Sequence, residues 1–224
     1  MKISQGINFL FGRLLNQSKI YLTYTLNYLS RKRNIDRNYM DYIRLSTLEL
    51  VAYEIDRNNI QGSVAELGVY KGKFARYINQ LFPNRKLYLF DTFMGFDEKD
   101  IKSEHDHTYS SGTQDFSNTS AQKVLKKMPH PEQCIIRQGH FPETATGLNE
   151  EFAFVNIDAD LFDPIYNGLQ YFYPRLSKGG YIFVHDYNND GYKGAREAVE
   201  KFCKENNINK LPLPDACGTV VLMK

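Results

Sequence analysis

Hydrophobic residues follow two different patterns along the chain, and the change lies near residue 60. In residues 1–60 they recur at the spacing of one helix face. These apolar positions include Ile3, Ile7, Leu10, Leu14, Leu22, Leu26 and Leu29. The spacing predicts an N-terminal helical extension over residues 1–60, with a second helix at 39–57. From residue 61 onward, short apolar runs alternate with segments of helical spacing, which predicts a separate domain over residues 61–224.

Six short apolar runs in this second part are predicted to be strands. They cover residues 63–69, 86–92, 134–139, 152–157, 180–185 and 218–223. The predicted helices cover residues 73–81, 120–128, 163–176 and 194–206. In the third of these helices, Asp163 is the expected N-cap and Pro164 the first helical residue. Because strands that alternate with helices form a mostly parallel sheet covered on both faces, the predicted fold class is α/β, with ligands at the carboxyl ends of the strands.

A polar stretch rich in Ser, Thr, His and Asp covers residues 98–119 and has no predicted strand or helix. A loop of this length inside a compact domain is typical of a functional lid or of a disordered segment. Of these two, we favour a lid that covers the binding site.

Composition narrows the classes of protein that the chain can represent. Its 224 residues, 42% of them hydrophobic, are enough for one domain with a real core. It contains no run of about 18 apolar residues, so a membrane-spanning helix is not expected. The net charge of +2 argues against a general nucleic-acid binder. Residues 1–40 carry seven basic residues and one acidic residue, a charge of +6, which leaves −4 for the remainder.

The cysteines and the N-terminal residues indicate a compartment. Cys134, Cys203 and Cys217 are scattered and odd in number, which is typical of a reducing environment. Arg13 interrupts the first apolar run, and no small-residue cleavage site follows, so no leader peptide is expected. We therefore expect a cytoplasmic protein.

The run Glu66-Leu67-Gly68-Val69-Tyr70-Lys71-Gly72 joins the end of the first predicted strand to a helix. Its two glycines let a ligand approach the backbone closely. A pyrophosphate site needs three glycines at a helix N-terminus, and here the triplet is incomplete and Glu66 would repel phosphate. The turn therefore favours a cationic or amino-bearing ligand, and an ordinary strand–helix turn is the alternative.

Asp91, followed by Thr92, ends the second predicted strand, 25 residues after Glu66. An acid at this position is where α/β nucleotide-binding folds hold the ribose hydroxyls. Together with Glu66 and the two glycines, it predicts a nucleoside-type ligand without phosphate. S-adenosylmethionine fits this description, because it has a ribose, an amino acid tail and a sulfonium.

Further acids and a histidine end the fourth and fifth predicted strands. Asp158 and Asp160 follow the fourth strand, and His185 and Asp186 the fifth. Because adjacent strands lie about 5 Å apart, Asp158, His185 and Asp186 are expected to converge on a divalent cation, Mg²⁺ or Mn²⁺. The alternative is structural, with Asp158 as a helix cap and His185 as a buried, hydrogen-bonded residue.

Six segments, taken in order, resemble one enzyme family. They are residues 66–72 as written above, 90–96 (Phe-Asp-Thr-Phe-Met-Gly-Phe), 139–144 (Gly-His-Phe-Pro-Glu-Thr), 157–160 (Ile-Asp-Ala-Asp), 174–180 (Pro-Arg-Leu-Ser-Lys-Gly-Gly) and 185–187 (His-Asp-Tyr). This set resembles the macrocin O-methyltransferase family, whose members are S-adenosylmethionine-dependent, metal-assisted enzymes that methylate sugar hydroxyls. The likeness runs from about residue 40 to the C-terminus.

The resemblance implies a Rossmann-like class I methyltransferase fold, with a seven-stranded, mostly parallel sheet and an antiparallel last strand after the N-terminal helices. The implied cofactor contacts are Glu66, Gly68, Tyr70, Gly72, Asp91, Thr92 and Asp158. The implied metal ligands are Asp158, His185 and Asp186. Better-known members have an aspartate in place of His185 and a histidine in place of Asn188. His185 is therefore either a metal ligand or the general base.

The predicted reaction is methyl transfer to a hydroxyl of a sugar, a glycoside or a related natural product. Asp158, His185 and Asp186 are the predicted catalytic residues, and His140 is a more remote proton acceptor. One alternative is a Mn²⁺-dependent glycosyltransferase that uses the run Asp158-Ala159-Asp160. Another is a non-catalytic protein that keeps the fold. A homo-oligomer is also expected, with the N-terminal helices over the cofactor site or in the interface.

Overall fold

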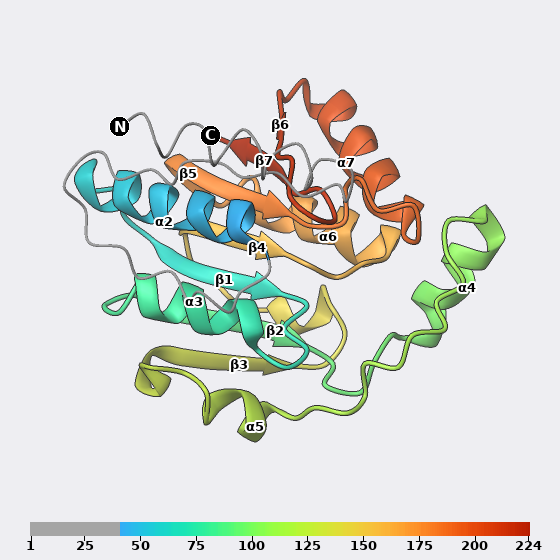
Figure 1. The fold of residues 1–224 in the computed structure, drawn as a ribbon, viewed down its shortest axis with the longest axis horizontal. Coiled ribbons are helices and arrows are strands. Elements are labelled where there is room, and N and C mark those ends of the chain that lie inside the picture. The colour runs from blue at the N-terminus through green and yellow to red at the C-terminus, as the bar shows by residue number, and fades with distance from the viewer. Residues whose placement is uncertain (1–40) are drawn as a thin grey trace, which may run out of the picture. The chain divides into compact units, whose positions relative to one another are not determined.

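The computed structural model describes residues 41–224, which form a seven-stranded sheet with helices on both faces (Figure 1). The strands are β1 Ser63–Leu67, β2 Leu87–Asp91, β3 Cys134–Gln138, β4 Phe152–Ile157, β5 Leu176–Val184, β6 Leu211–Pro212 and β7 Val220–Met223. The helices are α2 Tyr42–Arg57, α3 Lys73–Leu81, α4 Glu98–His107, α5 Ala121–Leu125, α6 Phe162–Phe172 and α7 Lys193–Asn206. Short 3₁₀ turns lie at Pro131–Gln133 and Glu143–Ala145. None of these helices is both long and apolar enough to cross a membrane.

The strand order is β3-β2-β1-β4-β5-β7-β6. The five strands from β3 to β5 are parallel, whereas β7 runs antiparallel to both β5 and β6. The order reverses between β1 and β4, because the chain returns to the middle of the sheet after β3. Ligands of open α/β sheets bind outside the carboxyl ends of the strands at such a switch point. The register places Asn156 beside Glu66 there.

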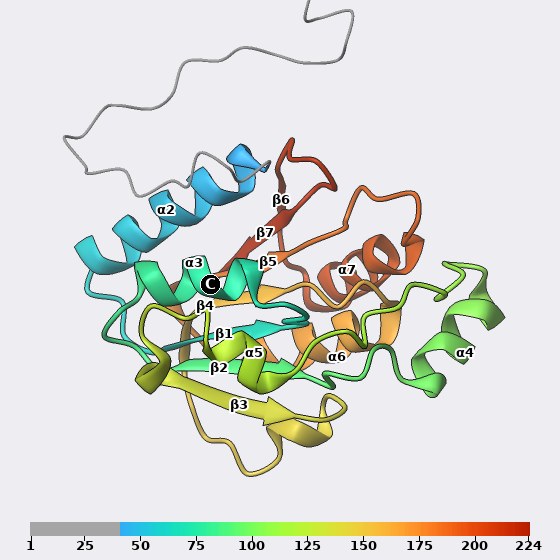
Figure 2. The same cartoon turned by 60° about the horizontal axis from the view of Figure 1, so that its bottom comes forward.

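Both faces of the sheet are buried. Figures 1 and 2 show α2 and α3 on one face and α6 and α7 on the other. On the first face, Leu48 and Ile55 of α2 belong to the same apolar cluster as Phe154 of β4. On the second face, Phe172 of α6 and Phe202 of α7 pack with the other side of the strands. This two-sided burial explains why the strands read as continuous apolar runs rather than as alternating ones.

The α/β fold with a mostly parallel sheet and an antiparallel last strand is confirmed. The predicted helix at 39–57 is described from residue 41 and begins at Tyr42. The apolar positions and the basic residues within residues 1–40 lie outside the described residues. The boundary at residue 60 stays a prediction, and α2 contributes directly to the core beneath the sheet.

The predicted bounds around α6 and β5 were wrong. The helix begins at Phe162 with Leu161 as its cap, so Asp163 and Pro164 are its second and third residues. Backbone N–H groups in the first turn of a helix have no partner within the helix. Proline, which lacks this N–H group, is therefore tolerated at the third residue of α6 as well as at the predicted first position. Strand β5 starts at Leu176 rather than at residue 180, because Leu176 pairs with Phe152 across an irregular register. The short strand β6 was not predicted.

The polar stretch at 98–119 contains a helix, α4, that was not predicted. Asp97 caps it by accepting a hydrogen bond from Lys99 N at 2.9 Å. Its inward face is polar: Glu104 is fully buried and accepts hydrogen bonds from Phe162 N at 2.7 Å and from Ser110 Oγ at 2.6 Å. The helix therefore docks through carboxylates, and hydrophobic periodicity could not reveal it.

Candidate active site

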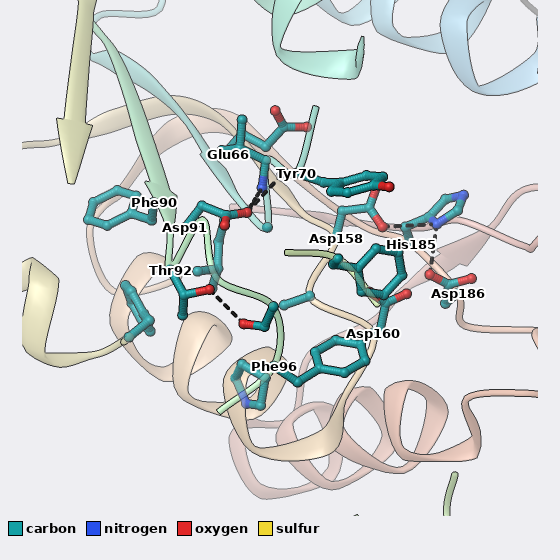
Figure 3. Close-up of a pocket in the computed structure, with 18 of the residues that line it drawn as sticks. Glu66, Tyr70, Phe90, Asp91, Thr92, Phe96, Asp158, Asp160, His185 and Asp186 are labelled. Atoms are coloured by element: carbon teal, nitrogen blue, oxygen red, sulfur yellow. Dashed lines mark hydrogen bonds and ion pairs between the residues drawn. The ribbon is translucent and has the colours of Figure 1, made fainter. Parts of the chain in front are cut away.

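A cavity of about 510 Å³ lies at the carboxyl ends of β1, β2, β4 and β5 (Figure 3). Strand ends supply most of its acidic residues, and the segment from Gly95 to Phe116 covers part of it. Eight of the nine predicted site residues line this cavity, and Gly72 is the exception. The eight are Glu66, Gly68, Tyr70, Asp91, Thr92, Asp158, His185 and Asp186. The volume lies in the range of small-ligand sites.

The turn after β1 has a backbone that only certain residues tolerate. Gly68 has φ +84°, and a Cβ there would lie 2.0 Å from the carbonyl oxygen of Asp158. Gly72 has φ +70° and is the N-cap of α3, and a Cβ there would lie 2.8 Å from Val124. Tyr70 also has a positive φ of 48°. Gly72 is thus a structural residue, and its glycine allows α5 to pack against the turn.

Glu66 is almost fully buried at the end of β1. Its Oε1 accepts a hydrogen bond from Asn156 Nδ2 at 2.9 Å, whereas Oε2 is buried without a hydrogen-bond partner among the described residues. Burial, followed by the negative charge of Asp158, raises the pKa of Glu66 well above its usual range. A buried acceptor without a donor is costly, so this oxygen indicates that a ligand supplies the donor.

Asp91 holds the same turn from the neighbouring strand. Its Oδ2 accepts hydrogen bonds from Val69 N at 2.7 Å and Tyr70 N at 2.8 Å, and its Oδ1 accepts one from Phe93 N at 2.5 Å. Thr92 donates to Gly95 O at 2.6 Å and so fixes the start of the covering segment. Asp91 therefore shapes the turn after β1 and also lines the cavity.

His185 lies between two carboxylates, as Figure 3 shows. Its Nδ1 is 3.1 Å from Asp158 Oδ1 and 2.9 Å from Asp186 Oδ2. Burial lowers the pKa of His185, but the charge of Asp158 and the hydrogen bonds to both acids outweigh it and raise that pKa to about 10. Burial raises the pKa of Asp158, and the charges of Arg44 and His185 outweigh it and hold that pKa well below its usual range. In this arrangement, His185 is a cation between the two acids.

Asp160 adds a third carboxylate to the group. One carboxylate oxygen from each of Asp158, Asp160 and Asp186 lies within 4.8 Å of the other two. Three carboxylate oxygens match the ligand preference of Mg²⁺ or Mn²⁺, so these residues fit a divalent cation. The sequence-based ligand set shares Asp158 and Asp186 with this group. His185 Nδ1 contacts both of those acids, so the predicted ligand residues do come together.

Backbone strain is concentrated along this edge of the sheet. Seven non-glycine residues in the described part of the chain have positive φ. Four of them follow strand ends at the cavity or beside it: Tyr70, Phe93, Asp160 and Asp186. Strained backbone of this kind gathers at functional sites. Sequence patterns do not report φ at residues other than glycine, so this signal was not accessible before the structure.

Arg44 and Asn156 line or support the site and were missed from the sequence. Arg44 reaches in from α2 and donates from Nη2 to Asn156 Oδ1 at 2.9 Å and to Asp158 Oδ2 at 3.0 Å. A sequence signal existed, because Arg44 shares the apolar stripe of α2 with Leu48 and Ile55. A charged residue in such a stripe needs a buried partner.

His140 lines the same cavity and contacts a different pair of acids. Its Nε2 is 3.0 Å from Asp100 Oδ2, and its Nδ1 is 2.9 Å from Glu143 Oε2. Burial lowers the pKa of His140, but its hydrogen bonds to Glu143 and Asp100 prevail and raise it. With both ring nitrogens engaged by acids, His140 is a structural or ligand-lining residue.

The family model of macrocin O-methyltransferases (TylF) matches residues 35–222. The chain belongs to this family. It is 28% identical over 182 residues to the mycinamicin III 3''-O-methyltransferase of Micromonospora griseorubida, a match that covers 74% of this chain and 70% of the relative. It is also 23% identical over 198 residues to a tetracenomycin-rhamnosyl 4'-O-methyltransferase of Streptomyces olivaceus, covering 81% and 72%.

Solved structures agree on the fold. The O-methyltransferase NovP superimposes with a TM-score of 0.64 at 21% identity, covering 81% of this chain and 79% of NovP. The calicheamicin methyltransferase CalS11 has the same TM-score at 18% identity, covering 80% and 78%. The class I methyltransferase fold and the resemblance to the macrocin family are thereby confirmed, and the O-methyltransferase class of enzyme with them. The metal and the homo-oligomer stay predictions.

Proposed function

We propose that this family member transfers a methyl group from S-adenosylmethionine to a hydroxyl of a sugar or glycoside, assisted by a divalent cation. One observation supports this most directly. The buried, unpartnered oxygen of Glu66 and the three carboxylates of Asp158, Asp160 and Asp186 open into the same cavity. The first needs a donor such as an ammonium group, and the second can hold a cation and accept a proton.

The cofactor half of the cavity fits a nucleoside that carries an amino acid. Glu66 Oε2 offers a buried acceptor for the ammonium group. Asp91 holds the glycine turn in the shape that admits a ligand beside its backbone, and its carboxylate retains acceptor capacity for ribose hydroxyls. The carboxylates of Glu66 and Asp91 in this half of the wall would repel a pyrophosphate, which favours S-adenosylmethionine over a dinucleotide.

The half of the cavity that we assign to the methyl acceptor is lined by the three carboxylates and by aromatic rings. Tyr70, Phe116, Phe96 and Tyr192 form a chain of rings, with centroids 4.9, 5.1 and 6.4 Å apart from one ring to the next. All four residues line the cavity that holds the carboxylates. A pyranose ring has an apolar face and a rim of hydroxyls, so it can lie against the rings while one hydroxyl points to the acids.

The chemical step needs alignment and a proton acceptor. The acceptor oxygen forms a bond to the methyl carbon, the carbon–sulfur electron pair stays on sulfur, and the hydroxyl proton passes to a carboxylate. His185 does not take this proton, because it is already a cation between Asp158 and Asp186. Alignment of the two reactants can supply about 7–11 kcal/mol.

A divalent cation would be held by Asp158, Asp160 and Asp186, with His185 beside them. When bound, such an ion lowers the pKa of a coordinated hydroxyl and orients it. The chain's own contribution is to hold the acids in place: Arg44 and His185 anchor Asp158, and Asn189 Nδ2 donates to Asp186 Oδ1 at 2.7 Å.

Calorimetry with S-adenosylhomocysteine, and separately with a nucleotide diphosphate plus Mn²⁺, tests the cofactor assignment. We expect the first to bind and the second not to bind. Glu66→Gln should weaken binding of S-adenosylhomocysteine by about tenfold, because it removes the anionic acceptor. Glu98→Gln changes a carboxylate outside the cavity and serves as the control. Binding of the diphosphate alone would favour the glycosyltransferase alternative, and binding of neither would favour the non-catalytic one.

A further inference from the structure

Arg44 stands apart from the other charged residues of the site, because it comes from a helix that precedes the sheet. It belongs to the first turns of α2, and only 3% of its surface is exposed. Its guanidinium lies 4.0 Å from the centroid of the Phe74 ring and reaches the cavity wall. Packing alone does not require a charge here, since neighbouring positions on this helix face are filled by leucine.

One nitrogen of Arg44 contacts two residues at the carboxyl end of β4. Nη2 donates to Asn156 Oδ1 at 2.9 Å and to Asp158 Oδ2 at 3.0 Å. Because Asp158 Oδ2 is held in this way, the other oxygen, Oδ1, faces His185 at 3.1 Å. The orientation of the Asp158 carboxylate in the acceptor half of the cavity therefore depends on Arg44.

The same contact sets the orientation of a buried amide. A guanidinium can only donate hydrogen bonds, so Asn156 must present its oxygen to Arg44. Its Nδ2 then points to Glu66 and donates to Oε1 at 2.9 Å. Arg44 thus contacts one carboxylate directly and a second through one amide, and both carboxylates line the cavity.

A buried ion pair is a poor device for stability alone. Replacing such a pair by apolar residues is often neutral or stabilising, whereas removing one partner leaves a buried charge uncompensated. We propose that Arg44 is a positioning residue of the methyl transfer, which acts by fixing Asp158 and, through Asn156, Glu66. The proposal rests on the proposed function and adds a residue that contributes from outside the strand ends.

The test is a double-mutant cycle with Arg44→Met and Asp158→Asn, measured by methyl transfer and by calorimetry with S-adenosylhomocysteine. If Arg44 acts through Asp158, each single variant lowers kcat by about tenfold or more, and the double variant is no worse than Asp158→Asn. Arg57→Met is the matched control, since Arg57 is exposed at the other end of α2. Additive losses in the double variant, or an unchanged kcat in Arg44→Met, would overturn the proposal.

Two further measurements separate positioning from folding and from a failure of the proposed function. If Arg44→Met does not fold, Arg44→Lys takes its place, because lysine keeps the charge but lacks the planar, rigid donor group. We expect it to melt like the wild type while kcat falls by about tenfold. A crystal structure of the variant shows the Asp158 carboxylate directly, whether or not methyl transfer is detected. A carboxylate that has turned from its wild-type direction supports the proposal, and an unmoved one contradicts it.

Discussion

The protonation of His185 makes the stability of the apo-protein depend on pH in a defined direction. Only 14% of this side chain is exposed, and its pKa rises from 6.5 to about 10 between Asp158 and Asp186. At about 1.4 kcal/mol per pKa unit, the charged imidazole contributes at most about 5 kcal/mol to folding. Because the folded-state pKa is the higher one, this contribution is complete below pH 6.5 and is lost as the pH rises towards 10.

Urea unfolding in excess chelator measures this contribution. We expect the free energy of unfolding of the wild type to fall by about 2 kcal/mol between about pH 6.5 and pH 8.5. His185→Gln should remove most of that slope, because glutamine does not titrate. His107→Gln, which changes an exposed histidine on α4, should keep it. An NMR titration of the His185 ring gives the folded-state pKa independently.

Two outcomes would refute this reasoning. If the wild type and His185→Gln lose stability in parallel over this range, the imidazole is not the cation that the two acids hold. If the His185 ring titrates near 6.5, the Asp158 and Asp186 contacts at 3.1 and 2.9 Å do not stabilise its charged form.

Three other changes test particular parts of the site. Gly68→Ala should lower the free energy of unfolding by about 2 kcal/mol or more, because a Cβ would meet a backbone carbonyl oxygen at 2.0 Å. Gly147→Ala, where φ is +73° and no atom lies within 4 Å of the added Cβ, should lower it much less. Equal losses in the two variants would contradict the clash. Asp91→Asn should lower the affinity for S-adenosylhomocysteine about tenfold in calorimetry, because the amide would turn a donor towards the backbone N–H groups that Asp91 now accepts from. An equal loss in Asp115→Asn, which changes an exposed residue, would argue against this. Phe116→Leu should raise KM for a glycoside without changing the affinity for S-adenosylhomocysteine; a changed cofactor affinity alone would place this ring in the wrong half of the cavity.

The parts of the site that could be predicted from the sequence are those that strand register decides. Glu66, Asp91, Asp158 and Asp186 each follow an apolar run, and parallel strands bring their carboxyl ends to one edge. Residue type then indicates a cationic ligand and a metal. The same reasoning places the cavity at the switch in strand order, without any knowledge of side-chain direction.

Other features depend on geometry that a linear pattern does not contain. Arg44 is far from Asp158 in the sequence, and only the packing of α2 on the sheet brings their side chains to 3.0 Å. Helix α4 docks through buried Glu104, so its polar sequence resembles a loop. The contacts of His185 with Asp158 and Asp186, at 3.1 and 2.9 Å, likewise depend on side-chain directions that the sequence does not contain.

Methyl transfer itself is the most direct test of the central claim. The protein would be incubated with S-adenosylmethionine labelled in its methyl group, Mg²⁺ or Mn²⁺, and a panel of glycosides and sugar nucleotides, and the products analysed for a labelled methyl ether. We predict a labelled ether with the wild type and none with Asp158→Ala, although that variant still binds S-adenosylhomocysteine. Equal transfer by Asp158→Ala, or full transfer in excess chelator, would contradict a metal-assisted reaction at these carboxylates.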